Sequence, residues 1–78
     1  MSKADKSIMK GFEKAGAKNV RLEKVGNKYR RAYMLVNGVE CQVQKIPSSS
    51  SLDASALERK ARDYVGKFAK YNTTTLVW

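Results

Sequence analysis

The chain has 78 residues, and its 16 Lys and Arg against 7 Asp and Glu give a net charge of +9. A chain of this length forms one domain with a small core, and a positive surplus favours phosphate-rich partners. Histidine is absent, which removes the commonest general base and metal ligand, and a single cysteine excludes an intramolecular disulfide. We therefore expect a protein that is not an enzyme and has no catalytic residues, cofactor or metal site.

No apolar run of the sequence is long enough to span a membrane. The first 15 residues carry charges throughout, unlike a signal peptide. We therefore expect a cytoplasmic protein without membrane association, in which Cys41 is a buried small hydrophobic residue.

The first predicted element is an amphipathic helix over residues 4–15. Ile8 and Phe12 fall on one side of this helix, and Ser2 is suited to cap its start. Lysines gather on the opposite side: Lys3, Lys6, Lys10 and Lys14. This lysine stripe has two open interpretations, an edge that contacts phosphates or a solvated helix face.

Residues 19–25 and 29–36 are predicted to form two strands around a three-residue loop. With this loop length, the apolar residues of both strands lie on one side, which is why we prefer it to a two-residue loop. The expected cross-strand pairs are Val25–Tyr29, Glu23–Arg31 and Arg21–Tyr33.

A second hairpin is predicted from residues 29–36 and 39–46, because Asn37-Gly38 is a strong signal for a two-residue turn. Strict alternation places an apolar set on the core side: Ala32, Met34, Val36, Val39, Cys41 and Val43. The other side is basic, aromatic and amide-rich, with Tyr29, Arg31, Tyr33 and Leu35 opposite Ile46, Gln44, Gln42 and Glu40.

The rest of the chain is predicted to form a Ser-rich loop at 47–52, a helix at 54–70 and a tail at 71–78. Asp53 can cap the helix. Its apolar stripe comprises Leu57, Ala61, Tyr64, Val65 and Phe68. The β-prone tail could fold back on the core, pair with a sheet edge or fray. We favour docking, onto the domain or onto a second subunit, because the tail ends in Trp78.

These elements predict a single α+β domain over residues 1–78. We expect a two-layer sandwich of order α-β-β-β-α, with both helices on one face of a three-stranded antiparallel meander. Over residues 4–70 this order resembles the double-stranded RNA-binding domain fold and the HicA-type toxins. Residues 39–65, a strand, a Pro/Ser turn and a charged helix, resemble small HicA-like proteins. HicA-type ribonucleases have a histidine where Asn27-Lys28-Tyr29 stands here, so the resemblance does not imply their chemistry.

Residues 18–31 hold six basic residues against one acidic residue, Glu23. This concentration favours a nucleic-acid-binding protein, DNA or RNA, that mainly contacts phosphates. The candidate contacts are Arg21, Lys24, Lys28, Tyr29, Arg30, Arg31 and Tyr33 on the first hairpin, and Lys10, Lys14, Arg59, Lys60 and Arg62 on the helices. The tyrosines could stack on unpaired bases or pack across strands.

Two alternatives remain open. The first is a protein-binding module, such as a phage- or plasmid-type inhibitor of a host factor, anchored by Leu76-Val77-Trp78 or by Tyr33 and Leu35. The second is a HicA-like ribonuclease with altered catalysis. The sequence is compatible with a monomer or a homodimer.

Overall fold

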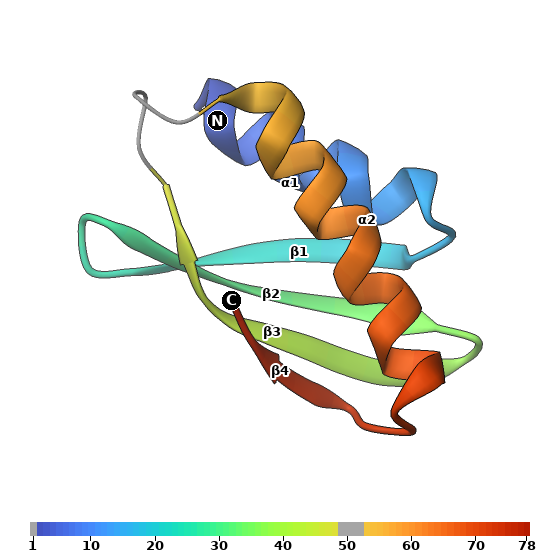
Figure 1. Ribbon diagram of the computed structural model, residues 1–78. Coiled ribbons are helices and arrows are strands. Elements are labelled where there is room, and N and C mark those ends of the chain that lie inside the picture. Colours follow the sequence, from blue (N-terminus) through green and yellow to red (C-terminus); the bar gives the residue numbers. More distant parts are fainter. Residues whose placement is uncertain (1, 49–52) are drawn as a thin grey trace.

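The computed structural model describes residues 2–48 and 53–78. Along the chain, the elements are α1 (Lys3–Lys14), β1 (Lys18–Val25), β2 (Tyr29–Val36), β3 (Val39–Pro47), α2 (Ala54–Lys70) and β4 (Thr75–Val77) (Figure 1). Each end that was predicted from the sequence lies within one residue of the observed one. The predicted Ser-rich loop falls largely at 49–52, outside the described residues.

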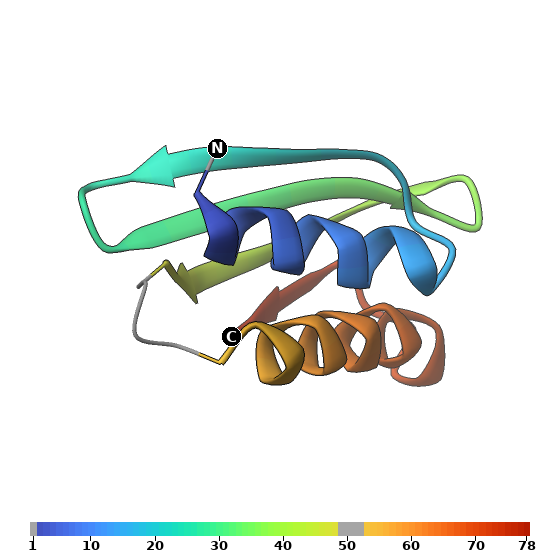
Figure 2. The same ribbon diagram turned by 90° about the horizontal axis from the view of Figure 1, so that it is seen from above.

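The strands form one sheet of order β1-β2-β3-β4. The first three are an antiparallel meander, and β4 adds to it as a parallel neighbour of β3. Both helices lie side by side over one face of the sheet, and the opposite face is uncovered (Figure 2). The expected α+β sandwich is therefore confirmed, with a fourth strand in place of a tail.

The core lies between the helices and the sheet because each element has one apolar face. Ile8 and Phe12 of α1, Ala32 of β2, Val43 of β3 and Ala61 of α2 have no exposed surface. The two helices meet closely at Gly11: a Cβ atom there would clash with the carbonyl oxygen of Glu58. A glycine at this position therefore sets how near α1 can lie to α2.

Both predicted hairpin registers are confirmed where the turn residues define them. The first pairs Val25 with Tyr29 across the three-residue loop. The second pairs Val36 with Val39, and Asn37 and Gly38 have φ values of 53° and 78°, as a type I′ turn requires. The uncovered face therefore carries the side chains that alternation assigned to it along most of β2.

The predicted pairing of Tyr29 with Ile46 is wrong. Lys45 has a φ of 57°, and the register shifts between Arg30 and Ala32, so that Arg30 lies opposite Ile46. This β-bulge inserts one extra residue and reverses the alternation beyond it. As a result Ile46 turns into the core, where it is fully buried.

The C-terminal residues pair with a sheet edge, one of the three outcomes left open by the sequence. The amide of Gln42 donates to the carbonyl of Thr74 at 2.9 Å, and the amide of Trp78 donates to the carbonyl of Gln44 at 2.8 Å. The Trp78 ring lies 5.0 Å from the Tyr64 ring, centroid to centroid. The Tyr64 hydroxyl also donates to the Val77 carbonyl at 3.2 Å. The tail is thus fixed to both layers of its own domain.

Candidate nucleic-acid interface

Arg30 does not belong to the exposed basic surface that the sequence predicted. It lies on the helix-covered side of β2, and its Nε atom donates to Oδ2 of Asp5 at 3.2 Å. The other carboxylate oxygen of Asp5 accepts a bond from Ser48 Oγ at 2.7 Å. The Arg30 side chain is only 14% exposed. Arg30 therefore joins α1 to the sheet and is not available to a ligand.

The remaining arginines of the first hairpin are paired with carboxylates; Arg21 is exposed and Arg31 is half-buried. Arg31 NH1 lies 3.1 Å from Glu23 Oε1, across the β1–β2 pair as predicted. Arg21 NH2 lies 3.9 Å from Glu40 Oε1, and both side chains are about two-thirds exposed or more. The charge that residues 18–31 concentrate along the sequence is thus partly neutralised on the folded surface.

The uncovered face of the sheet, called the open sheet face below, has a polar and aromatic centre. It comprises Arg21, Glu23, Val25, Tyr29, Arg31, Tyr33, Leu35, Glu40, Gln42 and Gln44. The Arg21 guanidinium lies over the Tyr33 ring, 5.2 Å from its centroid. A hydrogen bond with the Tyr33 hydroxyl, supported by the Glu23 carboxylate, raises the pKa of Arg31 above its ordinary value. These contacts hold the four side chains in place.

The end of the first hairpin carries three further candidates. Lys24 and Lys28 are exposed, and Tyr29 is 48% exposed. No ion pair involves Lys24 or Lys28 within residues 2–48 and 53–78. At the hairpin end, the positive charge of the predicted basic hairpin is therefore not balanced by acidic partners in the described part of the chain.

The outward sides of the two helices form a second surface, called the helix-layer surface below. Its basic residues are Lys3, Lys6, Lys10, Lys14, Arg59, Arg62 and Lys70. All are exposed, and among the described residues only Lys14 has an ion-pair partner. The sequence periodicity identified this stripe on α1, and it includes four of the five predicted helix contacts.

Glu58 lies inside this basic surface. Its Oε1 atom is 2.6 Å from Lys14 Nζ. The hydrogen bond from Lys14, helped by the nearby charges of Lys10 and Arg62, holds the pKa of Glu58 below its ordinary value. Lys10 and Lys14 of α1 and Arg62 of α2 therefore all lie near this carboxylate, so the cations of the two helices adjoin.

Lys60, the fifth predicted helix contact, has a different environment. Its Nζ atom lies 5.0 Å from the Trp78 ring centroid and 6.0 Å from the Tyr64 ring centroid. It therefore lies beside the docked C-terminal strand and at the border of the helix-layer surface.

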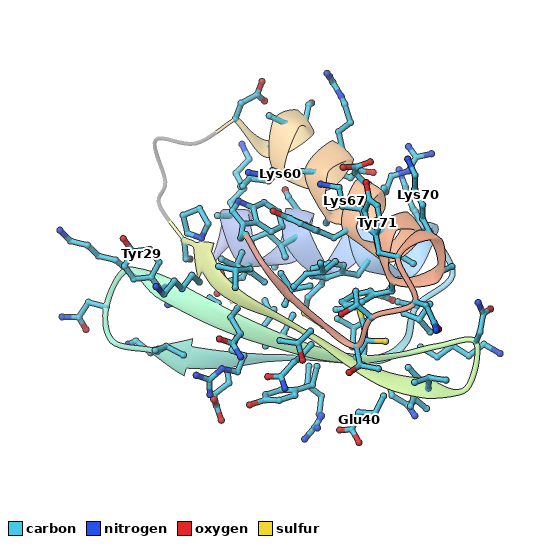
Figure 3. The ribbon with its side chains drawn as sticks, turned by 60° about the horizontal axis from the view of Figure 1, so that its bottom comes forward. Tyr29, Glu40, Lys60, Lys67, Lys70 and Tyr71 are labelled. Carbon is cyan, nitrogen blue, oxygen red and sulfur yellow. The ribbon has the colours of Figure 1, made fainter. Side chains whose placement is uncertain are left out.

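The predicted contacts consequently divide between two opposite sides of the molecule. In Figure 3, Lys60, Lys67 and Lys70 extend from α2 on one side of the sheet, and Glu40 lies on the other. A single flat ligand cannot touch both surfaces at once. The list of candidate contacts did not include Lys3 and Lys6 of α1, Lys70 of α2, or Gln42 and Gln44 of β3. Helix periodicity had placed Lys3 and Lys6, and cross-strand pairing had placed Gln42 and Gln44, on the faces where they lie.

Within the described residues, no group of three or more Cys, Asp or Glu side chains could hold a metal ion. In the same part of the chain, no helix is long and apolar enough to cross a bilayer. The thiol of Cys41 is buried, and this burial raises its pKa.

The fold and surface define a basic α+β protein with an α-β-β-β-α-β order. Comparisons with protein-family models, with curated proteins and with solved structures found no significant match. A function must therefore be argued from the chemistry of the two surfaces.

Proposed function

We propose that this protein binds nucleic acid, without catalysing a reaction, through phosphate contacts from the helix-layer surface and the end of the first hairpin. The observation that carries the proposal is the row of exposed cations on two adjacent helices, nearly all of them without an acidic partner in the described residues. Unpaired cations on a protein of net charge +9 attract a polyanion and release its counterions.

The order of elements also supports this proposal. Two helices over one face of a three-stranded meander are what the resemblance to double-stranded RNA-binding domains implies. In the proposal, the helices face the nucleic acid, and Lys24 and Lys28 extend the contact beyond them. Phosphate contacts of this kind position a nucleic acid and carry little sequence information. The proposal includes a cytoplasmic location.

The test removes positive charge from the helix-layer surface and compares the resulting loss of affinity with the loss caused by removing equal charge elsewhere. Arg59→Gln with Arg62→Gln should lower affinity for DNA or RNA oligonucleotides by roughly 10- to 100-fold at 0.1 M salt. It should also reduce the slope of log affinity against log salt by about 2. The matched control is Lys18→Gln with Lys45→Gln, which removes the same charge from exposed positions outside the helices.

The control variant should retain most of the affinity and the slope. Equal losses in both variants would show that net charge, and not the helix-layer surface, governs binding. Absence of binding to every single- and double-stranded oligonucleotide at low salt would reject the proposal.

A protein-binding module is the second candidate, because the open sheet face exposes apolar surface. Val25 is 39% exposed, and Val77 of β4, which pairs with Gln44 of this face, is 56% exposed. Leu76 and Trp78 are packed against the core and are less accessible as anchors than the sequence suggested. A host-factor inhibitor would bind a specific protein in a pull-down that survives nuclease treatment.

A further inference from the structure

The centre of the open sheet face differs in chemistry from the helix-layer surface. Arg21 and Arg31 are balanced by Glu23 and Glu40 in ion pairs. A surface with balanced charge attracts phosphate weakly. The groups at this centre are planar or hydrogen-bonding, so a ligand suited to it presents flat rings and polar edges.

Tyr33 is the central planar group. It lies on β2, opposite Arg21 on β1 and Gln42 on β3. The guanidinium of Arg21, whose side chain is 69% exposed, stacks 5.2 Å from the centroid of the Tyr33 ring. Tyrosine rings and arginine planes are the groups on which proteins stack unpaired bases.

Tyr29 provides a second ring on the same strand and the same face. It precedes Tyr33 by four residues, so the two are about 13 Å apart at about 3.3 Å per residue. Tyr29 is 48% exposed and lies at the end of the first hairpin (Figure 3). This separation leaves room for a different base on each ring.

Hydrogen-bonding groups flank these rings on β3. Gln42 and Gln44 lie side by side, with Gln44 Nε2 3.4 Å from Gln42 Oε1. Amides and carboxylates can pair with the polar edges of bases. A cation for the nucleic-acid backbone lies at one end of the row, because Lys28 directly precedes Tyr29.

We propose that the open sheet face binds unpaired bases of a single-stranded nucleic acid, with Tyr29 and Tyr33 as stacking platforms. This inference rests on the proposed function and names its ligand class. Bases inside a duplex are stacked on each other and are not available to the sheet. The protein should therefore distinguish a strand with accessible bases from a strand without them.

The experiment uses an abasic oligonucleotide, which has the sugar-phosphate backbone but lacks bases, beside the matching oligothymidine and its duplex with oligoadenine. The wild-type protein should bind oligothymidine more tightly than the abasic strand. Tyr33→Leu should weaken oligothymidine binding by roughly 5- to 100-fold and leave abasic and duplex binding unchanged. Tyr71→Leu is the matched control, because Tyr71 is 58% exposed beyond the end of α2 and outside the open sheet face.

Circular dichroism confirms that each variant is folded, and Tyr29→Leu, at the exposed hairpin end, repeats the test if Tyr33→Leu unfolds. Equal affinity of the wild-type protein for both strands, or no effect of either tyrosine variant, would overturn this inference and leave the proposed function intact. Tyr33→Leu could instead release a dimer or a captured protein while oligothymidine binding stays unchanged. That result would assign the face to protein docking and would also overturn this inference. No binding to any strand would reject the proposed function itself.

Discussion

Arg30 Nε lies 3.2 Å from Oδ2 of Asp5, and the two side chains are 14% and 11% exposed. Ser48 completes the group by donating to the second oxygen of Asp5. Asp5 lies on α1, Arg30 on β2, and Ser48 directly follows β3. A shielded ion pair with every carboxylate oxygen occupied ties the first helix to the sheet at the edge of the core.

Asp5→Ala should destabilise the protein by about 3 kcal/mol, because it leaves the guanidinium of Arg30 in a shielded place without its counter-charge. Ser48→Ala removes only a neutral donor and should cost about 1 kcal/mol. Urea denaturation followed by circular dichroism measures both. Equal, small losses would contradict a structural role for the ion pair. Arg30→Glu should also unfold the protein, so it is unsuitable as a test of nucleic-acid binding.

Gly11→Ala should destabilise the protein by about 1–3 kcal/mol, because a Cβ atom at this position meets the backbone of α2. The new atom would also lie 2.7 Å from Ala61 Cβ. Gly66→Ala is the matched control, since it lies in α2 with no atom within 4 Å of the added carbon. This control should stabilise by about 0.5–1 kcal/mol through helix propensity. Thermal denaturation of both variants should give shifts of opposite sign.

Lys45→Gly should stabilise the protein by about 1 kcal/mol. Lys45 has a φ of 57°, a left-handed conformation that costs a residue with a Cβ atom about 1–2 kcal/mol. Glycine adopts it freely but loses more conformational entropy on folding, so part of the gain is lost. The free energy of unfolding in urea measures the effect. Destabilisation by about 1 kcal/mol would mean that β3 continues without the bulge.

The contribution of Glu58 to stability should depend on pH. Its folded-state pKa lies below the ordinary value of 4.5, chiefly because of the hydrogen bond from Lys14. The carboxylate therefore stabilises the folded protein fully above pH 4.5, and this stabilisation is lost as the pH falls through the lowered pKa. The difference in unfolding free energy between the wild-type protein and Glu58→Gln should shrink over that range.

The Lys14→Met background is the control for this pH dependence. It removes the main cause of the lowered pKa of Glu58. The pH range over which the contribution of Glu58 to stability is lost should therefore move up towards pH 4.5. In the wild-type background, the effect of Glu58→Gln on the free energy of unfolding should change with pH. An effect that is the same at every pH would contradict the Lys14–Glu58 bond.

The sequence predicted most of the fold because the signals were local. The apolar stripe with Ile8 and Phe12 defined α1, and Asn37-Gly38 defined the second turn and its register. The bulge had no such signal, since lysine gives no indication of a left-handed backbone. Ile46 was therefore assigned to the wrong face. The sequence left pairing with a sheet edge open for the tail but could not identify β3 as the partner, because the two segments lie on either side of a helix.

The candidate surfaces were predictable only in part. The helix period placed the lysines of α1 outward, but ion pairing depends on residues distant in the sequence, such as Arg30 and Asp5, which are 25 positions apart. Two signals pointed to this pair. Arg30 alternates with Ala32 and Met34 on the core side of β2, and Asp5 precedes Ile8 and Phe12 in the apolar stripe of α1. A charge within each apolar face indicates a buried pair.

The placement of β4 determines the order in which the chain can fold. Adjacent strands of the meander are joined by tight turns, and they can associate quickly, whereas the whole of α2 separates β3 from β4. Closing so long a loop opposes early pairing, and Tyr64 must already be in position to receive Trp78. Because Trp78 is the only tryptophan, its fluorescence would report the last step of folding, separately from the collapse of the rest of the protein.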